Sequence, residues 1–247
     1  MNVVRTAPRI AALAGVAVAI AAGPAAVAQA APHVDVMVVG KAKVLKAPRS
    51  VALQARSVRV GGHRCAVGSA TPLSALAATG LRLQLHDYGS CSRRARDAGG
   101  LYVVRVGPDR ARRAAGWVYK VGHRVGTNGA ADPAGPFGRG RLGTRRPVLW
   151  FWCRQDRAGG CQRTLDARAA ASRVAPGAPL RVTVRGYDDQ GRGVRVAGAT
   201  VRLGRARALT GADGVATLTA PARTGRARLS AERSGMVPGF GGEIAVR

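Results

Sequence analysis

Cysteine and histidine are the residue types in this chain best suited to chemistry, and their spacing favours disulfides. The four cysteines are Cys65, Cys91, Cys153 and Cys161. An even number of cysteines in an exported chain is typical of two disulfides, and four cysteines allow three pairings. We expect Cys65–Cys91 and Cys153–Cys161, since the second pair closes a short loop containing two glycines. A zinc site is the competing interpretation, because His63 lies two residues before Cys65, but the spacing matches no usual zinc motif. We therefore expect no metal.

The residue types for catalysis are present, but their spacing does not form a catalytic group. His86 and Asp87 lie close to Cys91, but neighbouring residues of a strand point to opposite faces, and we expect Cys91 in a disulfide. Asp97 and Asp109 stand among arginines that would keep both carboxylates ionised, which leaves no acid for glycoside cleavage. The sequence therefore predicts no catalytic residues, no cofactor and no enzymatic activity.

Aromatic residues are concentrated in two predicted strands, 116–121 and 147–153. Alternation places Trp150 and Trp152 on the same face of the second strand. Both faces of that strand are apolar, which is typical of a buried central strand. The alternative is a ligand-stacking surface formed by Trp117, Tyr119, Trp150 and Trp152.

Positive charge is the strongest compositional signal, with a formal net charge of +28. Residues 31–164 contain 24 basic and 6 acidic side chains, a net charge of +18, whereas residues 165–247 have a net charge of +8. The arginines gather in three predicted loops: Arg93, Arg94 and Arg96; Arg110, Arg112 and Arg113; and Arg139, Arg141, Arg145 and Arg146. One interpretation is that all three groups are solvated surface. The other is that they contact anionic cell-wall polymers, and the first two groups are the main candidates for those contacts. No module specific for nucleic acid is recognisable.

The first thirty residues have the pattern of a secretory signal peptide. Arginines at positions 5 and 9 precede an Ala- and Val-rich apolar run, and Ala28-Gln29-Ala30 forms a small-residue cleavage site. We expect the mature chain to begin at Ala31. It would be secreted, with no further transmembrane segment, and either released or held at the envelope by charge.

The rest of the chain reads as two β-rich domains. Strands are predicted at 34–40, 57–60, 81–85, 101–106 and in the two aromatic segments, with one helix beginning after Thr71. This order predicts a small α+β sheet domain over residues 31–164. Residues 165–247 contain short alternating segments separated by turns, including the Asp213-Gly214 hairpin, which predicts an immunoglobulin-like β-sandwich.

Two segments of the chain resemble known domain families. Gly116-Trp117-Val118-Tyr119-Lys120-Val121, followed by a Gly-rich loop and a second aromatic strand, resembles the transcobalamin C-terminal-like domain family over residues 34–153. That resemblance implies a small sheet with one helix and, as one alternative, binding of a cobalamin-type small ligand through the aromatic strands. Residues 174–246, with Val196-Ala-Gly-Ala-Thr-Val201, resemble bacterial immunoglobulin-like modules, which implies a spacer or adhesive unit.

The sequence therefore predicts a secreted, non-enzymatic binding or cell-surface-associated protein whose ligand and oligomeric state it does not identify. One alternative is an envelope protein held to anionic polymers by charge, and another is a small-ligand binder that uses the aromatic strands.

Overall fold

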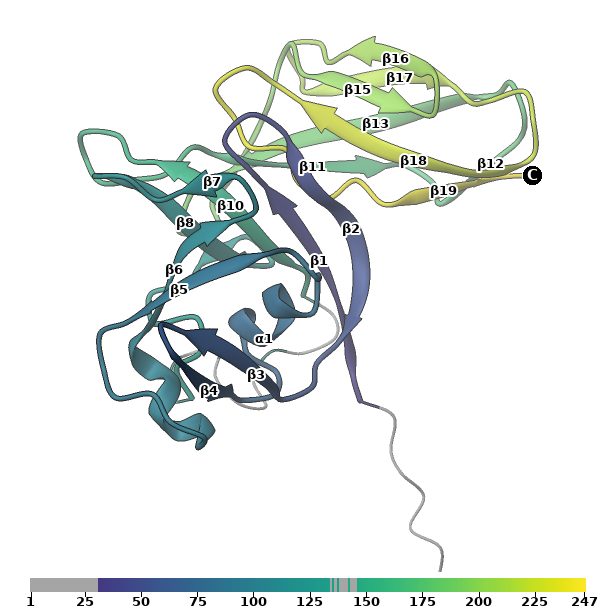
Figure 1. Ribbon diagram of the computed structural model, residues 1–247. Helices are drawn as coiled ribbons and strands as arrows, with labels where there is room; N and C mark the ends of the chain where they lie inside the picture. Colours follow the sequence, from purple (N-terminus) through teal and green to yellow (C-terminus); the bar gives the residue numbers. More distant parts are fainter. Residues whose placement is uncertain (1–30, 134, 136, 138–141, 143–145) are drawn as a thin grey trace, which may run out of the picture. The chain divides into compact units, whose positions relative to one another are not determined.

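Strand β10 (Val148–Arg154) is the central strand of the first sheet. The computed structural model describes residues 31–133, 135, 137, 142 and 146–247. Within them, β10 pairs in parallel with β1 (His33–Val39) and antiparallel with β8 (Ala115–Val121). Strands β2 (Val44–Ala52) and β9 (Arg124–Val125) complete the order β2–β1–β10–β8–β9. Figure 1 labels the first four of these strands.

The two faces of β10 enter two different hydrophobic clusters, as the alternation predicted. Val148, Trp150 and Trp152 belong to the main core of the first half. Leu149, Phe151 and Cys153 belong to a smaller cluster on the opposite face. A segment covered on both sides has no solvent-facing positions, and this explains why residues 148–153 are apolar throughout, whereas Arg154 at the end of β10 is exposed. The central-strand interpretation is confirmed.

Helix α1 (Pro72–Ala77) packs against the first sheet. Thr71 Oγ1 accepts the backbone N–H of Ser74, and Ser74 Oγ accepts the backbone N–H of Thr71, so the helix begins with a reciprocal capping box. Pro72 occupies the first helical position, where the missing N–H costs nothing. Leu73 and Leu76 are fully buried in the main core. The predicted helix is confirmed.

Two smaller sheets and a 3-10 helix complete the first half. One sheet is a hairpin of β3 (Arg56–Val60) and β4 (His63–Val67). The other has three strands, β5 (Leu83–Asp87), β6 (Leu101–Val106) and β7 (Asp109–Arg110). The 3-10 helix is η1 (Ala95–Gly100). The sequence did not predict β2, which contains Pro48 and alternates poorly. Proline is tolerated there because β2 is an edge strand that pairs only with β1.

The second half is an immunoglobulin-like β-sandwich. One sheet consists of β11 (Thr164–Ala169), β13 (Pro179–Tyr187), β14 (Gly193–Arg195) and β17 (Val215–Thr219). The other consists of β12 (Arg173–Val174), β19 (Glu243–Val246), β18 (Gly225–Glu232), β15 (Thr200–Leu203) and β16 (Ala206–Leu209). Alternate residues of each long strand face the shared core; Leu180, Val182 and Val184 do so in β13. The predicted fold class, mostly β with a small one-helix sheet region before a sandwich, is confirmed.

Residues 31–247 form one compact unit with three hydrophobic clusters. The domain boundary between residues 164 and 165 stays a prediction. The third cluster spans this boundary, because Phe151 and Leu149 share it with Val237 and Phe240. The predicted signal peptide, residues 1–30, lies outside the described residues. Among those that are described, no helix is long and apolar enough to cross a membrane.

Both predicted disulfides are present. Cys65 is bonded to Cys91, and Cys153 is bonded to Cys161. His63 Nε2 lies 3.5 Å from Cys91 Sγ, so the structure does bring the histidine to the cysteines that suggested a zinc site. Both thiols of that group are used by the disulfide. The pairing chosen from the spacing is confirmed.

Candidate functional site

The four aromatic residues of the predicted stacking surface do come together. Antiparallel pairing of β8 with β10 places Tyr119 opposite Trp150 and Trp117 opposite Trp152. The Trp117 and Trp152 rings meet edge to face at 5.7 Å, and the Tyr119 and Trp150 rings lie 5.2 Å apart. None of the four side chains is more than 6% exposed. The cluster is therefore part of the core, which corrects the expectation of an open ligand-stacking surface.

Polar atoms of these rings are also satisfied internally. The Trp150 indole N–H donates to the carbonyl of Pro72 at 3.1 Å, and the Trp117 indole N–H donates to the carbonyl of Asp109 at 2.9 Å. The Tyr119 hydroxyl donates to the carbonyl of Asn128, and burial raises the pKa of Tyr119 to about 12. Because each of these N–H or O–H groups donates to a backbone carbonyl, the three rings hold the neighbouring loop and helix segments in place. Trp152 also lines a surface pocket.

The structure separates the predicted arginine groups. Arg93 and Arg94 are exposed before η1, and Arg96 lies 3.7 Å from the carboxylate of Asp97. Arg113 is exposed at the tip of the turn before β8. The other two arginines of that second group, Arg110 and Arg112, line the pocket that contains Trp152. Arg139, Arg141 and Arg145 lie outside the described residues.

We call this cavity the basic pocket. Its volume is about 430 Å³, and its lining residues are Lys41, Arg105, Pro108, Asp109, Arg110, Arg112, Ala115, Trp152 and Arg154. Five of the nine are cationic and one is acidic, so the lining carries a net charge of +4. Such a concentration of positive charge around a cavity raises the local concentration of anions.

Asp109, the one carboxylate in the lining of the basic pocket, is already hydrogen-bonded to the backbone. Asp109 Oδ2 accepts the backbone N–H of Lys41 at 2.9 Å, which ties the end of β1 to β7. No side chain of the five cations forms a hydrogen bond or an ion pair with any residue that the structure describes. The Nε atom of Arg105 is buried without a hydrogen-bond partner. A buried donor without an acceptor is costly, and an anion in the pocket would remove that cost.

Strand pairing adds a second feature that favours an anion beside this group. The hairpin between β6 and β7 turns through Gly107, whose φ of +56° suits glycine, and Pro108. This turn places Arg105 directly opposite Arg110. Like charges at directly opposed positions of a sheet destabilise the pair. Two guanidinium groups held side by side can instead grip one phosphate, sulfate or carboxylate, since each offers a fork of N–H donors.

Sequence reasoning identified Arg110, Arg112 and Trp152 but missed the other three cations. Lys41 follows the first strand, Arg105 lies within β6, and Arg154 is the last residue of β10. No local motif joins positions so far apart along the chain. The presence of Arg105 in an otherwise apolar strand, Leu101–Val106, was the one available signal.

The histidines and acids considered for catalysis have structural partners. Asp87 Oδ1 accepts the N–H of Gly89, and its Oδ2 accepts the N–H of Cys91 at 2.7 Å. The hydrogen bond from Cys91 lowers the pKa of Asp87, which therefore serves as an ionised cap for the turn after β5. His86 packs edge to face on exposed Tyr88 at 4.4 Å.

Comparisons with known proteins add little to this picture. No protein-family model matches the chain, and no curated protein does so either. Among solved structures, the D00-D0 domain of intimin is similar at 15% sequence identity with a TM-score of 0.29, over 79% of this chain and 93% of that one. The resemblance to the transcobalamin C-terminal-like family receives no support from these comparisons and stays a prediction from the sequence. The immunoglobulin-like description of residues 164–247 rests on the strand order of the two sheets.

Proposed function

We propose that this protein is an exported, non-enzymatic module that binds phosphate-bearing anionic polymers of the cell envelope through the basic pocket. The observation that carries the proposal is that five cations line one cavity and none of their side chains has a partner among the described residues. In the sandwich, Arg202 pairs with Glu232 at 2.7 Å and Arg226 pairs with Glu243 at 3.2 Å. The basic pocket holds five cations and no such partner among the described residues.

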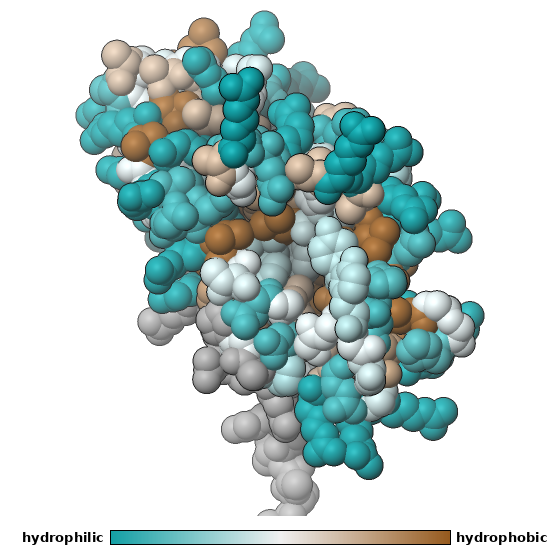
Figure 2. Space-filling view, turned by 90° about the vertical axis from the view of Figure 1, so that its left-hand side faces the viewer, coloured by the Kyte–Doolittle hydropathy of each residue, from teal (hydrophilic) through white to brown (hydrophobic). Residues whose placement is uncertain are grey.

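Export is part of the same proposal. Residues 1–30 have the pattern of a signal peptide, and the two disulfides suit an oxidising compartment. Anionic wall polymers and lipid head groups are the abundant polyanions outside a bacterial cell. Hydrophilic side chains dominate the face in Figure 2, where brown apolar patches lie between them. A module of this kind would be retained at the envelope by contacts that salt can reverse.

The test measures binding of the full chain from Ala31 to a poly(glycerol phosphate) polymer. The pocket variant R110S/R112S/R154S removes three positive charges from the basic pocket, and the control R93S/R94S/R96S removes three from the exposed segment around η1. Wild-type binding that uses about four phosphate contacts should weaken roughly 100-fold between 50 and 200 mM salt. The pocket variant should lose most of that affinity and have a flatter salt dependence, while the control should change little.

Equal losses in the two variants would mean that binding follows net charge and that the pocket is irrelevant. Absence of binding by wild-type protein at low salt would overturn the proposal itself. Thermal unfolding of both variants serves as a check on folding, since exposed arginines contribute little to stability.

A further inference from the structure

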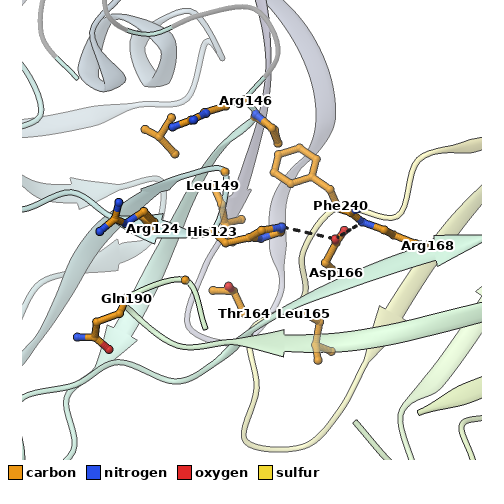
Figure 3. A pocket seen from close by; sticks show the side chains of 14 residues that line it. His123, Arg124, Arg146, Leu149, Thr164, Leu165, Asp166, Arg168, Gln190 and Phe240 are labelled. Carbon is orange, nitrogen blue, oxygen red and sulfur yellow. Dashed lines mark hydrogen bonds and ion pairs between the residues drawn. The ribbon is translucent and has the colours of Figure 1, made fainter. Parts of the chain in front are cut away.

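A second cavity lies where the first sheet meets the sandwich (Figure 3). We call it the junction pocket; its volume is about 560 Å³, within the range of small-molecule sites. The turn between β8 and β9 contributes His123, β9 contributes Arg124, and Arg146 precedes β10. From the sandwich come Asp166 and Arg168 of β11 and also Phe240. Cavities between two packed cores are a common location for ligands.

The frame around the junction pocket is held by buried contacts. Lys120, next to the β8–β9 turn, is fully buried, and its Nζ donates to the carbonyls of Tyr187 and Asp188 at 3.1 and 2.9 Å. The backbone N–H of Val125 donates to the carbonyl of Asp189 at 3.0 Å. These bonds join β8 and β9 to the β13–β14 turn, so the cavity exists before any ligand enters it. A preformed site avoids the cost of ordering loops on binding.

Charge in the junction pocket is unbalanced. Asp166 is its one carboxylate, and that group is already engaged by Arg168 Nε at 2.9 Å and His123 Nε2 at 3.6 Å. Arg124 and Arg146 line the same cavity, and neither side chain forms a hydrogen bond or ion pair with any described residue. Two guanidinium groups are thus available to a ligand. The described lining of the pocket contains no second carboxylate that could balance their positive charge.

The remaining walls are apolar or flat. Leu149 is 3% exposed, and Phe240 lies beside it in the cluster that joins the two halves. The His123 ring stacks on Tyr187 with centroids 3.6 Å apart and planes within 2° of parallel. Burial lowers the pKa of His123, so its ring is an uncharged wall at neutral pH. A ligand that fills this space needs an apolar body as well as an anionic group.

We propose that the junction pocket binds a small organic anion, held by Arg124 and Arg146 at its charged group and by Phe240 and Leu149 along its apolar body. This inference does not depend on the basic pocket. It concerns a ligand of low molecular weight and a different set of residues. Because the ligand would contact both halves of residues 31–247, its binding would also strengthen their association.

The experiment uses phenyl phosphate as the probe and isothermal calorimetry on the full chain from Ala31. Phenyl phosphate should bind about tenfold more tightly than inorganic phosphate, because the phenyl ring buries apolar area that phosphate alone does not have. The variant R124S/R146S should weaken phenyl phosphate by about tenfold or more, since charge-assisted hydrogen bonds are lost. The control R93S/R94S removes the same charge elsewhere and should bind as the wild type does.

A further variant, F240L, retains an apolar side chain but removes the ring. It should weaken phenyl phosphate and leave inorganic phosphate unchanged. The proposal is overturned if phenyl phosphate binds no better than inorganic phosphate, if it does not bind at millimolar concentration, or if R124S/R146S and the control are equally affected. The basic-pocket variant R110S/R112S/R154S should still bind phenyl phosphate normally, which keeps this outcome separate from that of the polymer experiment.

Discussion

Lys120 Nζ lies 3.5 Å from Asp189 Oδ1, and this ion pair joins strand β8 to the turn between β13 and β14. Lys120 is a fully buried lysine, and its neighbours explain how the charge is tolerated. Alternation in β8 directs Trp117, Tyr119 and Val121 into the main core, so Lys120 faces the other way, toward the sandwich. Burial lowers the pKa of Lys120, while Asp189 acts in the opposite direction.

The first prediction concerns this pair. Replacing Lys120 with Met keeps the volume but leaves the Asp189 carboxylate without its counter-ion and two carbonyls without their donor, so K120M should destabilise the protein by about 3–5 kcal/mol. The variants D189N and K120M/D189N complete a double-mutant cycle measured by urea unfolding. The double variant should cost less than the sum of the two single changes. Additive costs would show that the ion pair does not couple the two residues.

The second prediction concerns His123. Because burial lowers its pKa below the ordinary value of 6.5, the unfolded chain binds a proton at a higher pH than the folded chain. Asp166 opposes this shift, and Arg168 and Lys120 add to it. Stability should therefore fall as the pH drops through 6.5 toward the lower pKa of the folded state. The variant H123Q should flatten this dependence in urea midpoints compared between pH 8 and pH 5.5.

The control for that measurement is H33Q, a change at the exposed start of β1. It should retain the pH dependence of the wild type. A dependence that survives in H123Q would assign the effect to other groups.

The third prediction tests the aromatic core. Trp150 is 1% exposed and donates to the carbonyl of Pro72, so W150F should leave that acceptor unpaired and open a small cavity. We expect a loss of about 1–3 kcal/mol in the free energy of unfolding. Trp152 has no such hydrogen bond within the described structure, and W152F is the matched control with a smaller expected loss. Equal losses would show that the indole hydrogen bond contributes nothing measurable.

The fourth prediction compares the disulfides. Cys65 and Cys91 are 26 residues apart, and Cys153 and Cys161 are 8 apart. In the chain-entropy account, C65S/C91S should cost about 3–4 kcal/mol and C153S/C161S about 2–3 kcal/mol, because the longer loop restricts the unfolded chain more. Differential scanning calorimetry would rank the two. The reverse order would mean that the short loop matters through its native contacts, such as the Cys161 N–H donated to Asp189 Oδ2.

The fifth prediction concerns the sandwich alone. The core of β11 to β19 is built only from residues 165–246 and contains no cysteine. A fragment of residues 163–247 should therefore unfold cooperatively and be insensitive to reducing agent. It should melt below the full chain, because Val237 and Phe240 lose their neighbours Leu149 and Phe151. A fragment that shows no cooperative transition would place the folding boundary elsewhere.

Local periodicity and turn chemistry were sufficient for much of the fold. Strict alternation identified β13, and the apolar run Val148–Cys153 identified the central strand with its two faces. Thr71, Pro72 and Ser74 specify the start of α1 through contacts within a few residues. The disulfide partners also followed from spacing. The strand and helix patterns depend on residues a few positions apart. The Cys65–Cys91 bond joins residues 26 apart, and its prediction followed from assigning the other two cysteines to the short 153–161 loop.

The tertiary structure alone decided which faces and charges meet. Strand β2 is a strand because β1 accepts it at the edge of a sheet, despite Pro48. The aromatic rings are buried because α1 packs over them. Lys120 is buried and bonded to the sandwich because the sandwich packs on its side of β8. Arg105 meets Arg110 through the pairing of β6 with β7. Arg154 belongs to the other sheet, where it pairs with Ala115, and it meets them only where the two sheets line the same pocket. The physical reason is that register and sheet-on-sheet packing depend on residues far apart in the chain, and no local pattern encodes those contacts.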